Sequence, residues 1–272
     1  MPLELVDTHC HLDGDPLGAQ VESVLNRARA AGVSWCVTIG TTAASSRDNV
    51  ELARRFPMLR AAVGIHPHEA GSVTDETFGA IEELSHAPGV VAIGEVGLDF
   101  YRQHADAEHQ REALVRFATL AKRRNLPILL HCRDAYDEML KLLRSIEPGP
   151  WRGVIHCASG PPAFIEGALA MGFWVSFSGT VTFSNAHAVR ELVPLVPDDR
   201  LLIETDAPFL APQPVRGQMN EPAHLAHTAA FLARLRGVSL EQLGAVTSRN
   251  ARTLFGLAET RNPLTEGCEA VS

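Results

Sequence analysis

Five short apolar runs, spread over the whole length of the chain, each lead into a side chain that can bind a metal ion. One such ending is unremarkable, but five of them indicate a single site to which the entire chain contributes. Imidazole and carboxylate groups are common protein ligands of divalent metal ions. The candidate ligands are His9 and His11 after the first run, Glu95 after VVAIG, His131 after PILL, His156 after GVI and Asp206 after LLIET.

β-rich runs alternate with amphipathic stretches along the chain, which predicts an α/β fold. The predicted strands are Leu3–Thr8, Ser34–Gly40, Arg60–Ile65, Val90–Glu95, Ile128–His131, Val154–His156, Trp174–Ser178 and Leu201–Glu204. The predicted helices are Ala19–Ala31, Arg47–Arg55, Thr74–Ser85, Ala107–Arg124, Asp134–Ile146, Pro162–Met171 and His224–Arg236, followed by two short helical pieces that end near Gly256.

A closed (β/α)8 TIM barrel explains this pattern better than an open, doubly wound sheet. An open sheet places its site at one switch point, between two or three strand ends. Here the candidate ligands follow strands one, four, five, six and eight. Residues after the first and last strands can meet those after the middle strands only if the sheet closes. We therefore predict a barrel with its site at the carboxyl ends of the strands.

The composition fits one domain. The chain has 272 residues, of which 46% are apolar, and its middle contains no stretch that resembles a linker. We predict a barrel domain over residues 1–258 and a flexible, polar tail over residues 259–272. No apolar run approaches the roughly 20 residues that span a bilayer, and strand-like sequence begins too early for a signal peptide. We expect a cytoplasmic protein with no membrane association and no obligate protein partner.

The five cysteines are scattered and odd in number, which favours free thiols in a reducing compartment. Cys10, Cys132 and Cys157 each adjoin a candidate histidine ligand. Because neighbours on a strand point to opposite faces, we predict that these thiols face the helices if the histidines face the barrel interior.

The net charge of −8 argues against extensive binding of duplex nucleic acid, because proteins that track a polyanion are usually basic. It permits a small phosphate pocket whose positive charge comes from metal ions. Four histidines and two carboxylates are more ligands than one tetrahedral ion needs. Two ions, about 3.5–4 Å apart, would use all six. The ligand types suit Zn or Mn, and the carboxylates extend the choice to Mg.

Nine segments, taken in order, resemble the TatD family of metal-dependent deoxyribonucleases, which belongs to the amidohydrolase-like barrels. The resemblance extends from about Leu5 to Gly256. The segments are DTHCHLD, GIHPHE, GEVGLDFYR, the stretch from Gln110 to LPILLHCRDA, VIHCASG, VSFSGTVTF, LLIETDAPFLAP, RGQMNEP and NARTLFG.

The resemblance implies that the family's metal ligands fall on the same six residues, His9, His11, Glu95, His131, His156 and Asp206. It also implies that Glu95 bridges two ions and that Asp206 orients or deprotonates the attacking water. The expected activity is removal of nucleotides from the 3′ end of single-stranded DNA, with RNA as a further possible substrate.

Other polar residues near the predicted strand ends are candidates for contact with substrate. They are His66, Tyr101, Arg133, Arg216, Asn220 and Glu221, with Asp99 in the same predicted loop as Tyr101, and with Glu204 expected to orient a metal ligand. Structural roles are open for several of them: Arg133 could pair with Asp134 or Asp137, and Asn220 could cap a helix.

Two rival functions remain open at this point. The same activation of water could hydrolyse another ester or an amide, such as an aminoacyl ester on RNA. A metal-stabilised scaffold without activity is the other reading, and it requires ligands that leave no open position for water.

Overall fold

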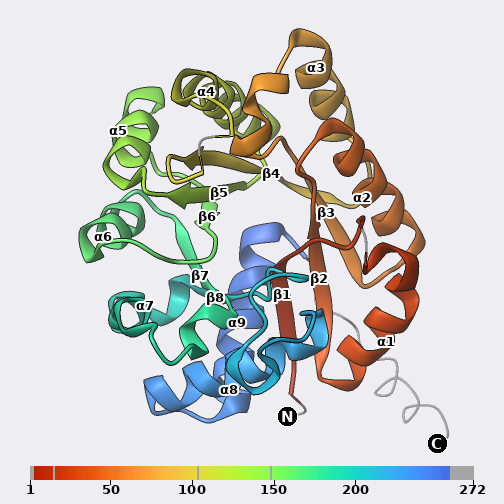
Figure 1. The fold of residues 1–272 in the computed structure, drawn as a ribbon, viewed down its shortest axis with the longest axis vertical. Coiled ribbons are helices and arrows are strands. Elements are labelled where there is room, and N and C mark those ends of the chain that lie inside the picture. The colour runs from red at the N-terminus through yellow and green to blue at the C-terminus, as the bar shows by residue number, and fades with distance from the viewer. Residues whose placement is uncertain (1–2, 15, 103, 148, 258–272) are drawn as a thin grey trace, which may run out of the picture.

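Eight parallel strands form a closed barrel in the computed structural model, which describes residues 3–14, 16–102, 104–147 and 149–257. The strands pair in chain order from β1 to β8. Two backbone hydrogen bonds join the segment after the last strand to the first strand and so close the barrel. The amide of Asp206 donates to the carbonyl of His9 (2.8 Å), and the amide of His11 donates to the carbonyl of Ala207 (2.7 Å). Figure 1 looks along the barrel and shows the helices around its outside. The predicted (β/α)8 barrel is confirmed.

Helices follow the strands throughout the described part of the chain. The strands are β1 (Leu5–Cys10), β2 (Val33–Ile39), β3 (Leu59–Val63), β4 (Val90–Asp99), β5 (Ile128–Arg133), β6 (Gly153–Ile155), β7 (Trp174–Phe177) and β8 (Leu201–Ile203). The helices are α1 (Val21–Ala30), α2 (Ala43–Arg55), α3 (Asp75–Leu84), α4 (Ala107–Arg124), α5 (Tyr136–Ile146), α6 (Pro162–Ala170), α7 (His187–Leu192), α8 (Leu225–Arg236) and α9 (Leu240–Phe255).

The strand β4 runs four residues beyond its predicted end. It continues past Glu95 to Asp99 and pairs with β5 there, Gly97 opposite His131 and Asp99 opposite Arg133. The prediction that Glu95 ends a strand is therefore wrong. Glu95 lies inside β4, and the polar residue at its end is Asp99.

The chain closes the barrel with one long helix, α9, where the sequence predicts two short pieces. Gly244, Thr247 and Ser248 all have modest helical propensity, which weakens the pattern. All three are buried in the structure. The Ser248 hydroxyl donates to the carbonyl of Glu4 (3.0 Å), so packing against the start of β1 compensates for the weak propensity.

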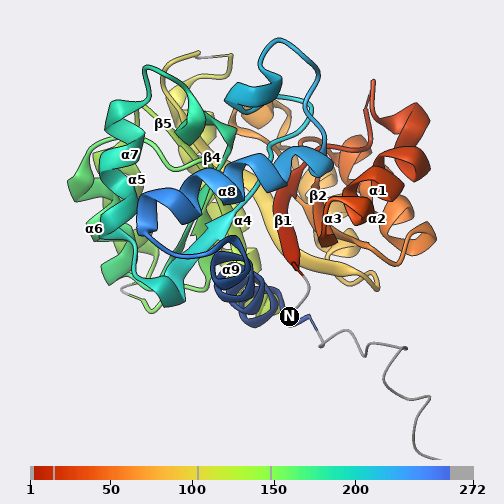
Figure 2. The same ribbon diagram turned by 90° about the horizontal axis from the view of Figure 1, so that it is seen from below.

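Two apolar clusters stabilise the barrel. The larger one lies between the strands and the surrounding helices, and the smaller one fills the barrel interior. Neighbours on a strand divide between them, as Leu5 and Val6 do. The inner cluster includes Leu254 and Phe255 of α9, and Figure 2 shows this helix beneath the amino ends of the strands. Because α9 seals that end, the carboxyl end is the one open to a substrate.

Gly244 sets how closely α9 approaches β1, and a pair of glycine substitutions tests this contact. A Cβ at Gly244 would lie 2.7 Å from the carbonyl oxygen of Glu4, whereas a Cβ at Gly79 in α3 would have no atom within 4 Å. Alanine is favoured over glycine in helix interiors by up to about 1 kcal/mol. We expect Gly79→Ala to raise the free energy of unfolding by about that amount. Gly244→Ala should instead lower it by roughly 1–3 kcal/mol.

Urea unfolding of both variants measures these changes. A rise in stability for both would contradict the close contact between α9 and β1.

Two expectations concern the organisation of the chain. The predicted flexible tail, residues 259–272, lies outside the described residues. Among the residues that are described, no helix combines the length and the apolar character that crossing a bilayer requires.

Candidate metal centre

The carboxylate of Glu95 is buried inside the barrel mouth, and its two oxygens face different groups of histidines. Oε1 lies 2.9 Å from Nδ1 of His131 and 2.9 Å from Nε2 of His156. Oε2 lies 3.3 Å from Nε2 of His9 and 3.9 Å from Nε2 of His11. The structure therefore gathers four candidate ligands around a fifth, the carboxylate of Glu95.

Asp206, the sixth candidate, completes the group on the Oε2 side. Its Oδ1 lies 3.4 Å from Nε2 of His11 and 3.6 Å from Nε2 of His9. These two Nε2 atoms are 3.3 Å apart. The candidate ligands thus form two adjoining groups that share Glu95.

In three of the four imidazole rings, the nitrogen that faces away from the metal-binding side lies within hydrogen-bond distance of an acceptor. The pairs are Nδ1 of His11 with the carbonyl of Ile39, Nδ1 of His156 with Oε1 of Glu204, and Nε2 of His131 with Oδ2 of Asp99, each at 3.2 Å. A ring nitrogen that donates carries the hydrogen, so the other nitrogen of a neutral ring carries a lone pair. In all three rings that lone pair faces the carboxylates. The ring of His9 differs, because its buried Nδ1 has no partner among the described residues.

This arrangement fits divalent cations. Lone pairs and carboxylate oxygens at these separations repel one another unless positive charge lies between them. Burial raises the pKa of Glu95, but the surrounding histidines, above all His156, outweigh it and hold that pKa well below its usual range. Imidazole and ionised carboxylate are ligands for Zn or Mn, and acceptors behind the rings are typical of metal-binding histidines. The residues present could therefore hold a cation on each side of Glu95.

His66 contacts the same carboxylate, but the ring nitrogen that it turns toward Glu95 carries a hydrogen and not a lone pair. Its Nδ1 accepts a hydrogen bond from the backbone amide of His68 (3.1 Å), so in the neutral ring the hydrogen is on Nε2. That Nε2 lies 3.5 Å from Oε1 of Glu95. Burial lowers the pKa of His66 to about 3, which keeps the ring neutral. A neutral donor suits a phosphate oxygen better than it suits a cation.

Asp99 links two histidines at the end of β4. Its Oδ2 lies 2.8 Å from Nε2 of His68 and 3.2 Å from Nε2 of His131. Burial raises the pKa of Asp99, but hydrogen bonds from His131 and from the backbone amide of Arg102 outweigh it and lower that pKa. From the sequence, Asp99 is expected in a loop after the strand. Its spacing of four from Glu95 could have revealed the role, because residues four apart on a strand share a face.

Gly97 allows β4 to lie against β5 beside His131. Its φ is 148°, and a Cβ at this position would meet the carbonyl oxygen of His131. Only glycine combines this backbone conformation with so close an approach. The glycine between Glu95 and Asp99 thus sets the distance between the two strands that carry these residues and His131.

A cavity of about 1020 Å³ opens at this end of the barrel, and five of the six candidate ligands line it. His66, Tyr101 and Arg133, which the sequence predicts to contact substrate, also line it. The guanidinium carbon of Arg133 lies 3.9 Å from the centre of the Tyr101 ring. Phe209, which was not among the predicted substrate contacts, belongs to the same lining.

Three other residues predicted to contact substrate are not part of this lining. Arg216 lies over the ring of Phe183 (3.9 Å), Glu221 pairs with Arg27 (2.6 Å), and the buried Asn220 donates to the carbonyls of Thr205 (2.9 Å) and Phe209 (2.6 Å). Each side chain thus contacts other parts of the protein and stabilises the segment after β8. The structure therefore does not place these three side chains in the cavity lining.

The cysteines follow the predicted alternation only in part. Cys10 points away from the cavity, with its thiol donating to the carbonyl of Val37 (3.4 Å). Cys132 packs in the apolar cluster between the strands and the helices, as predicted, and also borders the cavity, whereas Cys157 lines the cavity and does not belong to that cluster. For Cys157 the reason is local, because β6 ends at Ile155 and Cys157 has a φ of 46°.

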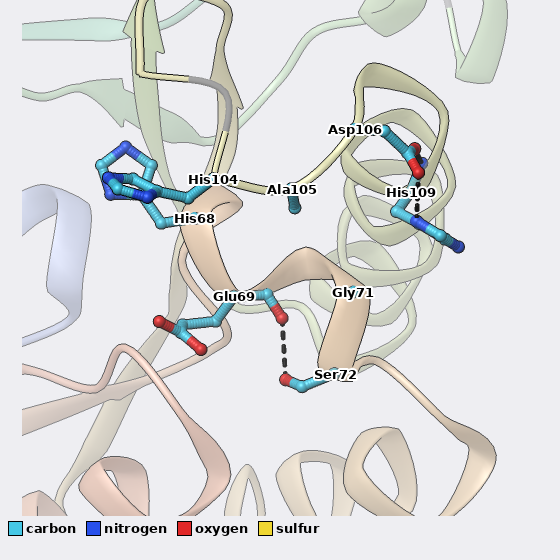
Figure 3. Close-up of a pocket in the computed structure, with 8 residues that line it drawn as sticks. All are labelled: His68, Glu69, Gly71, Ser72, His104, Ala105, Asp106 and His109. Atoms are coloured by element: carbon cyan, nitrogen blue, oxygen red, sulfur yellow. Dashed lines mark hydrogen bonds and ion pairs between the residues drawn. The ribbon is translucent and has the colours of Figure 1, made fainter.

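A second pocket, of about 400 Å³, adjoins the large cavity between residues 68–72 and 104–109. His68 and Glu69 belong to both linings. Figure 3 shows the rings of His68 and His104 close together, and their centres are 4.7 Å apart. Among the described residues, no set of three metal-binding side chains converges in this pocket. The metal-binding geometry therefore belongs to the larger cavity.

Comparisons with known proteins point to one family. The profile of the family described as TatD related DNase matches residues 6–256. The chain is 38% identical to the uncharacterized metal-dependent hydrolase YabD of Bacillus subtilis, over 92% of this chain and 98% of that one. It is also 38% identical to the 3'-5' ssDNA/RNA exonuclease TatD of Erwinia tasmaniensis, over 93% of this chain and 100% of that one. The crystal structure of the TatD homolog YJJV from Escherichia coli superposes with a TM-score of 0.89 at 31% identity, covering 95% of this chain and all of that one.

Proposed function

This chain belongs to the TatD related DNase family of metal-dependent hydrolases, and from that premise we propose that it is a two-metal phosphodiesterase that removes nucleotides from the 3′ end of single-stranded DNA. The proposed metal ligands are the two histidines of β1 and its end, Glu95, and the residues at the ends of β5, β6 and β8, namely His9, His11, Glu95, His131, His156 and Asp206.

One observation carries the two-metal part of the proposal. Glu95 turns one oxygen toward His131 and His156 and the other toward His9 and His11. A carboxylate that served a single ion would turn both oxygens toward that one ion, or would leave one of them to a hydrogen-bond donor such as a backbone amide. Here ring nitrogens surround both oxygens, as they would if Glu95 bridged two ions.

The chain's own groups divide the remaining work. Bound divalent ions would lower the pKa of water toward neutrality and offset the charge that develops on the phosphoryl group. Asp206, which lines the cavity, accepts the proton from the attacking water. His66 donates from Nε2 to a phosphate oxygen, and the guanidinium of Arg133 can bind another. Glu95 holds the two groups of ligands at a fixed spacing.

The proposed substrate is a strand end rather than a long duplex. The net charge of −8 disfavours an extended contact with many phosphates. The relative from Erwinia tasmaniensis is named an exonuclease of single-stranded DNA and RNA. Both facts support a short single-stranded segment inside the cavity.

A comparison of defined substrates tests the proposal. Stripped protein, reloaded with Mg, Mn or Zn, should release mononucleotides from a single-stranded DNA that carries its label at the 3′ end. An RNA strand, a blunt duplex and a small carboxylic ester form the other arms. Turnover of the ester without release of nucleotides would favour the alternative ester hydrolase. Fewer than one bound ion per chain in active protein would contradict a two-metal centre.

Glu204 offers a test of the metal site that does not depend on the identity of the substrate. Its Oε1 accepts hydrogen bonds from Nδ1 of His156 and from the amide of Cys157 (2.7 Å). Loss of such a partner typically weakens metal binding 10–100-fold. We expect Glu204→Ala to show a loss of this size in calorimetric metal titration. Glu204→Gln, which retains an acceptor oxygen, should lose less.

Circular dichroism of both Glu204 variants controls for misfolding. An unchanged metal affinity in a folded Glu204→Ala protein would contradict the inference that Glu204 orients His156 for metal binding.

A further inference from the structure

Two exposed aromatic rings stand out on a surface that is otherwise poor in them. Tyr101 is 60% exposed and Phe209 is 59% exposed, and they are the two aromatic residues among the large apolar side chains exposed in the described part of the chain. Both line the cavity that holds the candidate ligands. Exposed aromatic surface is disfavoured in water, so its concentration at one cavity points to a ligand with apolar faces.

The two rings lie on opposite sides of the barrel mouth. Tyr101 follows β4, and Phe209 follows β8. In a closed barrel of eight strands in chain order, these two strands are as far apart as any pair can be. Figure 2 shows the segments after β4 and β8 both rising at the end of the barrel opposite α9. A chain that crosses the mouth over Glu95 therefore passes from one ring to the other.

Each ring adjoins one group of candidate ligands. The ring centre of Phe209 is 6.0 Å from that of His11, which belongs to the Oε2 side of Glu95. Tyr101 lies under the guanidinium of Arg133, the residue two after His131 on the other side. The rings thus flank the candidate metal centre, one beside each group of ligands.

Phe209 is fixed in place although its ring is exposed. Its amide donates to the carbonyl of Asp206 (2.9 Å), and its carbonyl accepts from the buried amide of Asn220 (2.6 Å). The same Asn220 side chain also binds the carbonyl of Thr205 (2.9 Å). A ring whose backbone is anchored on both sides is preorganised, so little conformational freedom is lost when a ligand stacks on it.

We propose that Phe209 and Tyr101 are stacking platforms for the two nucleobases that flank the cleaved phosphodiester. This inference rests on the proposed nuclease function and names the part of the substrate that the cavity recognises. Every base has a π-face, so stacking binds nucleotides without selecting a sequence. The guanidinium over Tyr101 adds a positive charge that a phosphate next to the stacked base can contact.

The test compares two single-stranded oligonucleotides with identical phosphates. One carries normal bases, and in the other the last three nucleosides at the 3′ end are abasic. Stacking on one aromatic side chain contributes roughly 5- to 100-fold in affinity. With the same metal in each arm, the wild-type protein should prefer the base-bearing strand by at least about tenfold in kcat/KM.

Substitutions then assign this preference to the two rings. Phe209→Ala should lose roughly tenfold in kcat/KM on the base-bearing strand, mainly through KM, and nothing on the abasic strand. Phe209→Trp and Tyr101→Phe keep a ring and should retain the preference, whereas Tyr101→Ala should reduce it. Leu235→Ala, an exposed apolar residue on α8 outside the cavity lining, is the matched control. Quenching of a 2-aminopurine base near the 3′ end of a phosphorothioate strand should weaken in Phe209→Ala as well.

Three outcomes would overturn the inference, and they are distinguishable. Equal cleavage of both strands by the wild-type protein refutes base stacking and leaves the nuclease function standing. Cleavage of neither strand refutes the nuclease function and this inference with it. An equal loss on both strands in Phe209→Ala shows that Phe209 acts on the metal centre through His11 rather than on a base.

Discussion

Replacement of Glu95 by glutamine should reduce kcat/KM for a single-stranded oligonucleotide by roughly 10³-fold or more. Glutamine has nearly the same shape but offers one neutral oxygen in place of two charged ones. The single carbonyl oxygen of glutamine can face His131 and His156, or it can face His9 and His11. It cannot act as a ligand for both groups. Metal-based stabilisation of developing charge amounts to several kcal/mol, and each 1.4 kcal/mol corresponds to a factor of ten in rate.

Two measurements accompany the Glu95→Gln variant. Elemental analysis should show less than the full complement of bound metal, and a nucleotide-release assay should show the loss of rate. His131→Ala and Asp206→Ala should be similarly inactive. Glu241→Gln, an exposed carboxylate on α9 at the sealed end, controls for handling and should match the wild type. Retention of a tenth or more of the activity by Glu95→Gln would contradict a bridging role.

The largest effect on stability is expected from Asp7→Ala. The carboxylate of Asp7 is fully buried and joins the first strand to the segment after the last one. Its Oδ1 accepts from the amides of Thr205 (2.9 Å) and His9 (3.3 Å), and its Oδ2 accepts from the Thr205 hydroxyl (2.6 Å). Alanine leaves three buried donors without an acceptor. The expected loss in the free energy of unfolding is roughly 3–5 kcal/mol.

Asparagine at position 7 separates the loss of charge from the loss of hydrogen bonds. Burial raises the pKa of Asp7 to about 7, so the native site tolerates a neutral group of the same shape. Asp7→Asn should therefore lose much less stability than Asp7→Ala in urea unfolding. Asp48→Ala, at an exposed position on α2, should change the stability by less than about 0.5 kcal/mol. A similar small change for Asp7→Ala would show that other contacts close the barrel.

The barrel and the gathering of the candidate ligands could be predicted because both follow from regular patterns. The helix Ala107–Arg124 begins and ends as its spacing of apolar residues predicts. The order of the six polar residues along the chain requires a closed sheet, because Asp206 and His9 come from opposite ends of the sequence. These arguments need only periodicity and strand order.

The orientation of each ring could not be predicted, since it depends on contacts between distant residues. Nothing in the sequence indicates that the carbonyl of Ile39 contacts Nδ1 of His11. Nor does it indicate that the amide of His68 donates to Nδ1 of His66 and so leaves the hydrogen of that ring on Nε2. Asn220 illustrates the same limit. Its polar side chain after β8 resembles a substrate contact in the sequence, but in the structure all its hydrogen-bonding capacity is used within the loop.

The bonds of Asn220 also have a consequence for how this protein can diversify. Its side-chain amide ties down the carbonyl of Phe209, and its own backbone follows directly on residues 210–219. Asn220 therefore fixes both ends of that segment at the same place in the fold, and Asp206 lies outside the segment. Insertions, deletions or exchange between the two fixed ends would change the loop that adjoins the cavity at Leu210 and leave Asp206 in place. Substrate range and metal chemistry can thus evolve independently, which makes this segment the natural position for grafting new specificities.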